Sequence, residues 1–435
     1  MQKSRILLVV LAIVFSNVIK AQEKLSLSEA VKIAVQNSYD IKLVENTAAI
    51  AKNNNSYGVA GGLPTVSSTA SNNNTQSTIH QTFPDPSRNT TRSGVEGTTV
   101  NGSLNVSMIL FNGFRVAATK DRLESIEKQS AATLQNQMLT TSSIVMQQYY
   151  NVVRQEAYLK TILKSIEASE QRVAIVKTRQ QVGVANQADV LQSNIDLNAL
   201  LQAKENQLLV IDQAKADLYN SMVVPANSNY TFDQTIAVDQ NIKMAEVEAK
   251  MKDHPLLQSA QQLVNVNQFI EKETRATMYP TLRANTGYTY SSNRNGAGFI
   301  LLNESYGPFI GVNLALPIYN GGASKRAYNN AKIATNSAKL QLENTSLDLN
   351  TELFKTYKNY LNSIKQTPIE QENFKMSQEL LGLVMQKYQL GQATMVDVKQ
   401  AQQSFETAGF RLTSLQFTAK LAEIELKRLS NQLSF

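Results

Sequence analysis

Hydrophobic residues alternate with small polar residues in four short parts of this chain. In VNGSLNVSMIL, residues 100 to 110, most even positions are apolar and most odd positions carry Asn or Ser. Residues 310 to 316 and 282 to 290 repeat the alternation, and residues 65 to 75 show a weaker, more polar form. A period of two gives a β-strand one face of each kind. The pattern therefore predicts four strands, each with one apolar face.

Elsewhere the apolar residues follow helical spacing. Residues 114 to 182 contain no glycine or proline, and apolar residues recur at intervals of seven from Met138 to Val173. This spacing is typical of coiled-coil packing. At 1.5 Å per residue the segment predicts a helix of roughly 100 Å. Residues 187 to 222 also lack glycine and proline, so we expect them to fold back as the second arm of a hairpin.

The second half of the chain repeats this helical pattern. Residues 323 to 390 predict another long helix, although Pro368 and Gly382 interrupt it. Because proline lacks a backbone N–H and clashes with the preceding turn, we expect a kink or break near Pro368. Residues 27 to 60 and 243 to 278 are rich in Ala, Lys, Glu, Gln and Leu, and each predicts a shorter helix.

Paired motifs indicate that the two halves are copies of one plan. The pairs are LPTVSS at 63 to 68 with YPTLRA at 279 to 284, LFNGFR at 110 to 115 with IYNGGA at 318 to 323, and QVGVANQADVLQ at 181 to 192 with QLGQATMVDVKQ at 389 to 400. The first pair is offset by 216 residues and the other two by 208. The sequence predicts a first repeat at residues 22 to 225, a linker at 226 to 242 and a second repeat at 243 to 435.

The first 21 residues predict a secretory signal peptide. Lys3 and Arg5 precede an apolar run at residues 6 to 15, and a cleavage site follows Ala21. A membrane anchor is the alternative, but ten apolar residues are too few to span about 30 Å of hydrocarbon. No other stretch approaches 18 apolar residues, so we expect no transmembrane helix in the mature protein. Because no cysteine follows the signal, we expect no lipid anchor.

Composition excludes much of enzyme chemistry. The chain has no cysteine and only two histidines, His80 and His254. Disulfides, thiol nucleophiles and cysteine zinc sites are therefore absent, and a histidine triad or metal cluster is not expected. The net charge of +7 includes three basic residues in the signal, and the remaining basic residues form no cluster. We expect no catalytic site, no metal, no cofactor and no nucleic-acid partner.

The strands fit a membrane barrel, with lipid on the apolar face and water on the polar face. A soluble β-sheet domain is the alternative. Four strands cannot close a barrel and open edges are not tolerated in lipid, so a barrel requires several copies of the chain. Residues 71 to 96 and 291 to 305 predict long extracellular loops. The long helices carry too many Gln, Asn, Lys and Glu residues to cross a bilayer, so we expect them on the periplasmic side.

Each half of the chain contains, in the same order, an LP or YP site, an NG strand-to-helix junction and a G-x5-D tip. This repeated order resembles the TolC family of outer-membrane efflux channels. The resemblance covers residues 24 to 431. It implies a mainly α fold with a transmembrane β part. Three copies would form a twelve-stranded β-barrel, continued in the periplasm by a twelve-helix coiled-coil tunnel. It also implies a periplasmic adaptor and an inner-membrane transporter as partners, in an efflux pump or in type I secretion.

The resemblance also implies a periplasmic gate at Asp397, Asp189 and Tyr388. Asp397 would line the aperture, Asp189 would help to hold the tip closed, and Tyr388 would bond to the neighbouring hairpin. Around a threefold axis each aspartate becomes a ring of three carboxylates, which attracts cations. From the residues alone, Asn186 and Thr394 suit helix N-caps, with the two aspartates closing capping boxes. The two roles are compatible.

An adaptor-docking surface is implied at the same tips. The residues that match the family's tip motif are Val182, Gly183, Val184, Leu390, Gly391 and Gln392. They would form a groove that a partner hairpin fills. The alternative is that they only make tight turns, since the glycines suit the left-handed position after a helix. Ala393, Ala188 and Gln400 replace polar residues common in the family, so we expect a looser or differently latched gate.

The alternative function is a soluble periplasmic coiled-coil scaffold or adaptor. Adaptors have one hairpin and a lipoyl-like insert, whereas this chain predicts two hairpins and no such insert. The sequence predicts an outer-membrane channel in a Gram-negative cell envelope, and it does not specify the exported substrate.

Overall fold

The computed structural model describes residues 23 to 233, 235 to 297 and 300 to 433. The predicted signal peptide, residues 1 to 21, lies outside the described residues. The chain divides into two compact units. The first contains the residues up to Asn46, Ala132–Gln258 and those from Asn344 onward; the second contains Thr47–Ala131 and Ser259–Glu343. Each unit therefore draws on both halves of the chain.

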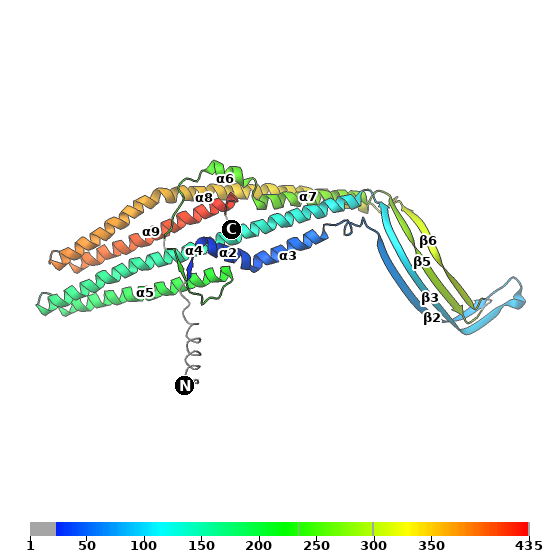
Figure 1. Cartoon of the computed structure of the whole chain (residues 1–435), viewed down its shortest axis with the longest axis horizontal. Helices are drawn as coiled ribbons and strands as arrows, with labels where there is room; N and C mark the ends of the chain where they lie inside the picture. The colour runs from blue at the N-terminus through cyan, green and yellow to red at the C-terminus, as the bar shows by residue number, and fades with distance from the viewer. Residues whose placement is uncertain (1–22, 234, 298–299, 434–435) are drawn as a thin grey trace, which may run out of the picture. The chain divides into compact units, whose positions relative to one another are not determined.

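Two long helical hairpins are present, as predicted. The helices are α4 (Arg115–Gln181), α5 (Gln187–Met222), α8 (Ala323–Gln389) and α9 (Met395–Leu429). In Figure 1, α5 lies beside α4 and α9 lies beside α8. Side chains join the arms of each hairpin: Lys215 on α5 pairs with Glu156 on α4 at 2.9 Å, and Arg411 on α9 pairs with Glu370 on α8 at 2.9 Å.

Helix α8 runs through Pro368 and Gly382 as a single helix, so of the kink or break predicted near Pro368, the break does not occur. Proline removes one backbone donor, which would bond the carbonyl of Ile364 one turn earlier. Packing on that side of the proline holds the helix in place. Tyr360 is 1% exposed, and Ile364 packs against the same hydrophobic cluster.

The two predicted shorter helices are each divided into two. The segments are α2 (Leu27–Asn37), α3 (Tyr39–Asn54), α6 (Met244–Met251) and α7 (Pro255–Ala276). The divisions fall at Ser38 and His254, which correspond at the offset of 216 residues. The Ser38 hydroxyl accepts a hydrogen bond from the N–H of Ile41 at 3.4 Å, and His254 Nδ1 accepts one from the N–H of Leu256 at 3.2 Å. These buried side chains compete with the helical backbone and start the next helix.

His254 is fully buried, and its Nε2 has no hydrogen-bond partner among the described residues. Burial, followed by the nearby Arg428 guanidinium, lowers the pKa of His254 from 6.5 to about 4, against the opposing effect of Glu425. The unfolded chain therefore binds a proton at higher pH than the folded chain. The stability that neutral His254 contributes is complete above about pH 6.5 and is lost as the pH falls toward 4.

We expect His254→Asn to remove part of the acid sensitivity, because asparagine keeps a cap acceptor and does not titrate. Between pH 6.5 and pH 4 this histidine costs the wild type up to about 3 kcal/mol of folding free energy. Melting temperatures at four pH values between 7.5 and 4.5 measure the difference. His80→Asn, on an exposed strand position, is the matched control. Equal acid slopes in the wild type and His254→Asn would contradict the prediction.

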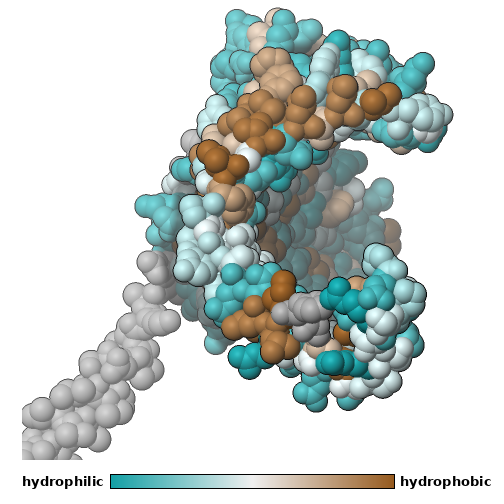
Figure 2. Space-filling model, turned by 90° about the vertical axis from the view of Figure 1, so that its right-hand side faces the viewer, coloured by the Kyte–Doolittle hydropathy of each residue, from teal (hydrophilic) through white to brown (hydrophobic). Residues whose placement is uncertain are grey.

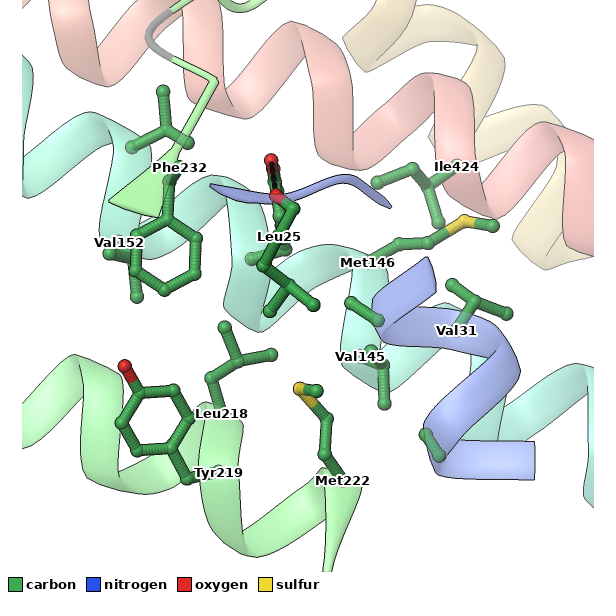
Figure 3. Close-up of a cluster of buried hydrophobic side chains, with 14 of the residues drawn as sticks. Leu25, Val31, Val145, Met146, Val152, Leu218, Tyr219, Met222, Phe232 and Ile424 are labelled. Atoms are coloured by element: carbon green, nitrogen blue, oxygen red, sulfur yellow. Dashed lines mark hydrogen bonds between the residues drawn. The ribbon is translucent and has the colours of Figure 1, made fainter. Parts of the chain in front are cut away.

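The main core of the first unit surrounds a short two-stranded sheet. Strand β1 (Glu23–Leu25) pairs in parallel with β4 (Tyr230–Phe232). Leu25 is 1% exposed, and in Figure 3 it lies among side chains from α2, α4, α5 and β4. The Tyr149 hydroxyl on α4 donates to the carbonyl of Leu25 at 2.9 Å and accepts from the N–H of Asp233 at 3.1 Å. One buried tyrosine therefore ties both strands to the long helix.

The second unit contains the four predicted strands, in the order β2-β3-β5-β6 and all antiparallel. Their bounds are β2 (Thr65–Gln81), β3 (Thr90–Phe111), β5 (Thr281–Asn295) and β6 (Leu302–Ala315). The loops predicted at 71 to 96 and 291 to 305 are therefore too long. Polar residues extend the strands because the ladder uses backbone groups, and their side chains bond across it, as Ser291 does to Asn101 at 2.8 Å.

The sheet has two chemically different faces. Val106 lies opposite Val66 on β2, and Met108 lies opposite Ala284 on β5, so apolar residues share one face. On the other face Ser103 lies opposite Thr69, and their hydroxyls are 2.8 Å apart. Figure 2 shows apolar residues in a band bordered by hydrophilic residues. In the described part of the chain, no helix is both long and apolar enough to span a membrane.

Candidate functional site

The two hairpin tips, where α4 meets α5 and α8 meets α9, have the same backbone. Gly183 and Gly391 have φ values of +79° and +77°, the left-handed conformation that ends a helix. In the first tip the N–H of Val184 donates to the carbonyl of Arg179 at 2.8 Å. In the second, Gln392 donates to Lys387 at the same distance. The predicted glycine turns are confirmed in both copies.

Both predicted capping boxes are present. Asn186 Oδ1 accepts from the N–H of Asp189 at 2.9 Å, and the Asp189 carboxylate accepts from the N–H of Asn186 at 3.1 Å. At the second tip the Asp397 carboxylate accepts from the N–H and the hydroxyl of Thr394, at 2.8 and 2.7 Å. The backbone N–H of Thr394, and then its hydroxyl, hold the pKa of Asp397 below its usual range. Asp397 is exposed, whereas Asp189 is half-buried.

Tyr388 is buried at the second tip and contacts the first hairpin. The guanidinium of Arg179, near the end of α4, lies over the Tyr388 ring at 4.7 Å and donates to the Tyr388 carbonyl. Burial raises the pKa of the Tyr388 hydroxyl above its usual value. Arg179 is a residue that the sequence analysis missed. A comparison of the two copies could have found it. At the offset of 208, Arg179 corresponds to Lys387 and Tyr388 to Gln180, so both residues of this contact differ from their counterparts.

A small hydrophobic cluster, which includes Tyr388, joins the two tips. Its buried members are Val176 and Val190 from the first hairpin and Met385, Tyr388 and Val398 from the second. The two tips therefore pack together within one chain. Separating them exposes these side chains to water, which makes the joined arrangement the more stable one for an isolated chain.

An ion-pair network lies about two turns from the tips. The carboxylate of Asp196 on α5 accepts from Arg172 on α4 at 3.1 Å and from Lys399 on α9 at 3.0 Å. The Arg172 side chain is 0% exposed, and that of Asp196 is 11% exposed. Nε and Nη1 of Arg172 have no hydrogen-bond partner among the described residues. Asp196 is therefore the only described carboxylate paired with this buried cation.

Sequence reasoning missed this network as well. From Ala393, Ala188 and Gln400 it expected a looser or differently latched gate, and these ion pairs lie elsewhere on the hairpins. Two signals were available. Asp196 follows Asp189 by seven residues, which places both on one side of α5. Arg172, Asp196 and Lys399 correspond to Leu380, Ser404 and Leu191 in the other copy, so all three charges break the repeat.

The six residues of the predicted docking surface are all exposed. Val182, Val184 and Leu390 are 69%, 74% and 73% exposed. A Cβ added to Gly183 meets no atom within 4 Å, so the space beside this turn is open. Exposed valine and leucine at a loop tip gain nothing from folding of the single chain.

Comparison with known proteins agrees with this architecture. The model of the family described as outer membrane efflux protein matches residues 20 to 222 and 247 to 432. The outer membrane protein TolC of Vibrio cholerae is 22% identical over 320 residues, covering 71% of this chain and 70% of that protein. The predicted TolC-like fold is confirmed by two solved structures of outer membrane proteins.

The Campylobacter jejuni outer membrane channel CmeC superimposes with a TM-score of 0.80 at 16% identity, over 93% of this chain and 85% of that chain. VceC, an outer membrane protein of Vibrio cholerae, gives a TM-score of 0.78 at 16% identity, over 93% and 95%. These likenesses concern the fold, and the family match concerns the sequence of both halves. The chain belongs to the outer membrane efflux protein family, and it is an outer-membrane channel protein.

Proposed function

We propose that this protein is the outer-membrane exit duct of a tripartite efflux pump or of a type I secretion system, and that it works as a homotrimer. The observation that carries the proposal is the sheet of the second unit. It has an apolar face and two unpaired edges, β2 and β6. Ile310 and Leu314 on β6 are 87% and 67% exposed in the single chain. Three such sheets side by side close a twelve-stranded barrel, which leaves no edge in lipid.

The soluble scaffold is the alternative, and the same observation weighs against it. In water the apolar face of β6 and the open edges would promote aggregation. Cell fractionation and gels of unheated and boiled samples separate the two functions. We expect the protein in the outer-membrane fraction, as a trimer band that boiling converts to a monomer. A soluble monomer would overturn the proposal.

The tandem repeats support this assembly. The described elements run helix pair, two strands and long hairpin, and then the same again. We infer that residues 22 to 225 and 243 to 435 are the two repeats, that residues 226 to 242 link them, and that the mature chain begins after Ala21. Three chains then supply six equivalent helical hairpins around one axis. Mass spectrometry of the purified protein measures the N-terminus.

The hairpin tips form the gate in this proposal. Asp397 lines the aperture, Asp189 supports the tip, and Tyr388 holds the two hairpins together through Arg179. The exposed, ionised Asp397 supports the first role. The ring and carbonyl contacts of Arg179 support the last. This function requires no catalysis, because the protein only lets solutes pass through a charged constriction.

The tips also receive a periplasmic adaptor, which connects the duct to an inner-membrane transporter. The exposed apolar residues at both tips support this assignment, because an adaptor hairpin would cover them. The docking surface comprises Val182, Gly183, Val184, Leu390, Gly391 and Gln392.

Val184→Glu is expected to abolish export, because it places a charge in the docking surface without touching the fold of the single chain. Gln187→Glu adds the same charge nearby but outside the six residues, and should leave export intact. Growth of cells that lack other exit ducts, on a panel of toxic dyes and antibiotics, provides the measurement. Trimer content is checked in parallel. Full resistance in the Val184→Glu strain would exclude docking at this residue.

A further inference from the structure

We propose that β6 of one copy and β2 of the next form an antiparallel ladder in one defined register. Leu314 then lies opposite Ala70 of the partner subunit, Val312 opposite the partner subunit's Asn72, and Asn313 opposite the partner subunit's Ser71. The inference rests on the homotrimer of the proposed function, and adds how its copies join. It follows from the internal repeat.

The two β-hairpins, β2–β3 and β5–β6, are equivalent residue by residue. Thr65 on β2 lies opposite Ser107 on β3. Adding the offsets of 216 and 208, which the sequence motifs supply, gives Thr281 and Ala315. These two residues are paired in the β5–β6 ladder. The offsets therefore hold within the strands as well as at the motifs, and the eight extra residues of the first copy lie beyond the shared part of the hairpin.

The chain already makes, between its own two β-hairpins, the contact that we propose between copies. Strand β3 pairs with β5, and Val106 lies opposite Thr286 in that ladder. Strand β6 is the copy of β3, and β2 is the copy of β5. Moving Val106 forward by 208 gives Leu314, and moving Thr286 back by 216 gives Ala70. The free edges of β6 and β2 therefore correspond to the edges of β3 and β5 that pair within one chain.

Gly113, just after β3, has close neighbours that its copy Gly321 lacks in the single chain. Where β3 ends, Gly113 has φ +67°, and a Cβ there would lie 2.7 Å from Tyr279 Cβ and 2.9 Å from the Ala276 carbonyl. Its copy, Gly321, has φ +64° and meets nothing within 4 Å. The same transfer predicts that Gly321 receives Leu63 and Ala60 of the partner subunit.

The aromatic residues near Gly113 and Gly321 also differ in how far they are buried. Phe111 and Gly113 line a pocket of about 440 Å³ together with Ala276 and Tyr279. Phe111 is half-buried, whereas its copy Tyr319 is 87% exposed. A neighbouring copy in the transferred position would place the partner subunit's Ala60 and the partner subunit's Leu63 near Tyr319, as Ala276 and Tyr279 line the pocket of Phe111.

The proposed register also satisfies the two faces of the sheet. Opposite residues of a ladder share a face, and a shift by one residue exchanges the faces. Leu314 and Val312 lie on the apolar face, together with Ala70 and Asn72 of the partner subunit. Asn313 lies on the polar face with the partner subunit's Ser71. Each shift by an odd number of residues would place aliphatic side chains of β6 beside the polar face of β2.

The test uses engineered disulfides. Because the chain has no native cysteine, any disulfide that forms must join two introduced cysteines. The in-register double variants are Leu314→Cys with Ala70→Cys, and Asn313→Cys with Ser71→Cys. Consecutive pairs alternate between hydrogen-bonded and non-hydrogen-bonded sites, so one of the two has the shorter separation. Within one chain the two cysteines are three strand spacings apart, about 14 Å, so they bond only between copies.

Mild oxidation of the purified trimer is expected to give a covalent trimer on a non-reducing gel for at least one in-register variant. The controls are Leu314→Cys with Ser68→Cys and Leu314→Cys with Asn72→Cys. They keep the face but shift the register by two residues, about 6.6 Å, beyond the reach of a disulfide. We expect less than a tenth as much covalent product from them.

Preferential bonding of a control pair, or no bonding at all in a protein that is trimeric by mass, would overturn the register and leave the trimer standing. A monomer by mass, without any cross-link, would overturn the proposed function itself. Gly321→Asn gives a second readout, because asparagine tolerates the left-handed backbone but fills the contact. We expect its trimer to dissociate at a lower temperature than that of Gly183→Asn, the matched left-handed glycine at the tip. Equal dissociation temperatures would exclude a close contact at Gly321.

Discussion

Asp196→Ala is expected to loosen the periplasmic tips by about 3 to 5 kcal/mol, because it leaves Arg172 buried without a counter-charge. The Arg172 side chain is 0% exposed, and Asp196 is the only described carboxylate paired with it. Such a loss raises the population of locally opened tips more than a hundredfold. Hydrogen exchange of the amides at the ends of α4 and α5, followed by mass spectrometry, measures the opening.

Two controls separate this buried pair from ordinary surface charge. Glu167→Ala breaks an exposed pair with Lys164, whose side chains are 64% and 63% exposed, and should change exchange by less than about 1 kcal/mol. The double variant Arg172→Met with Asp196→Leu replaces the buried pair by apolar side chains. It should recover most of the protection lost in Asp196→Ala. If Asp196→Ala behaved like Glu167→Ala, the network would not hold the tips.

The second large effect is on ion selectivity. Asp397→Asn is expected to abolish most of the channel's preference for cations, because it neutralises all three carboxylates of the proposed ring at once. Asparagine still offers an oxygen to the N–H of Thr394, so the helix cap survives and the change isolates the charge. Reversal potentials in planar bilayers under a salt gradient provide the measurement.

Asp189→Asn is the matched variant at the other tip. Asp189 is half-buried, so we expect a smaller change in selectivity from it than from Asp397→Asn. An unchanged reversal potential in Asp397→Asn would remove Asp397 from the aperture. A larger effect at Asp189 would reverse the assignment of the two aspartates.

The pH dependence of the wild type follows from the same carboxylate. The hydrogen bonds from Thr394 lower the pKa of Asp397 below its ordinary value of 3.8. A carboxyl with a lowered pKa stays ionised as the pH falls through 3.8 and is protonated only below that value. Cation preference should therefore persist as the pH falls from 7 toward 4 and disappear in stronger acid, at a pH that repulsion among the three carboxylates of the ring raises. The same bilayer recordings between pH 7 and pH 3 test this.

Local patterns in the sequence predicted much of the fold and part of the site. The capping boxes at Asp189 and Asp397 were predictable because their partners lie three residues away, within one turn. The two glycine turns were predictable for the same reason. Strand faces and helical hairpins follow from periods of two and seven, which depend only on spacing along the chain.

Other local details depended on packing. The divisions at Ser38 and His254 arise where a buried side chain bonds the backbone of the next helix. The continuity of α8 through Pro368 depends on burial of the preceding turns. Neither can be read from propensity, because the competing energies are about 1 to 3 kcal/mol and tertiary contacts decide between them.

The sequence by itself determined the duplicated plan, the caps and turns of both tips, and the two faces of the strands. Only the tertiary structure decided which side chains join the hairpins. Arg179 meets Tyr388, and Lys399 meets Asp196, through contacts between helices of different hairpins that the chain order does not bring together. The physical reason is range: a cap or an alternating face is fixed within a few residues, whereas a buried ion pair exists only where packing excludes water from both charges.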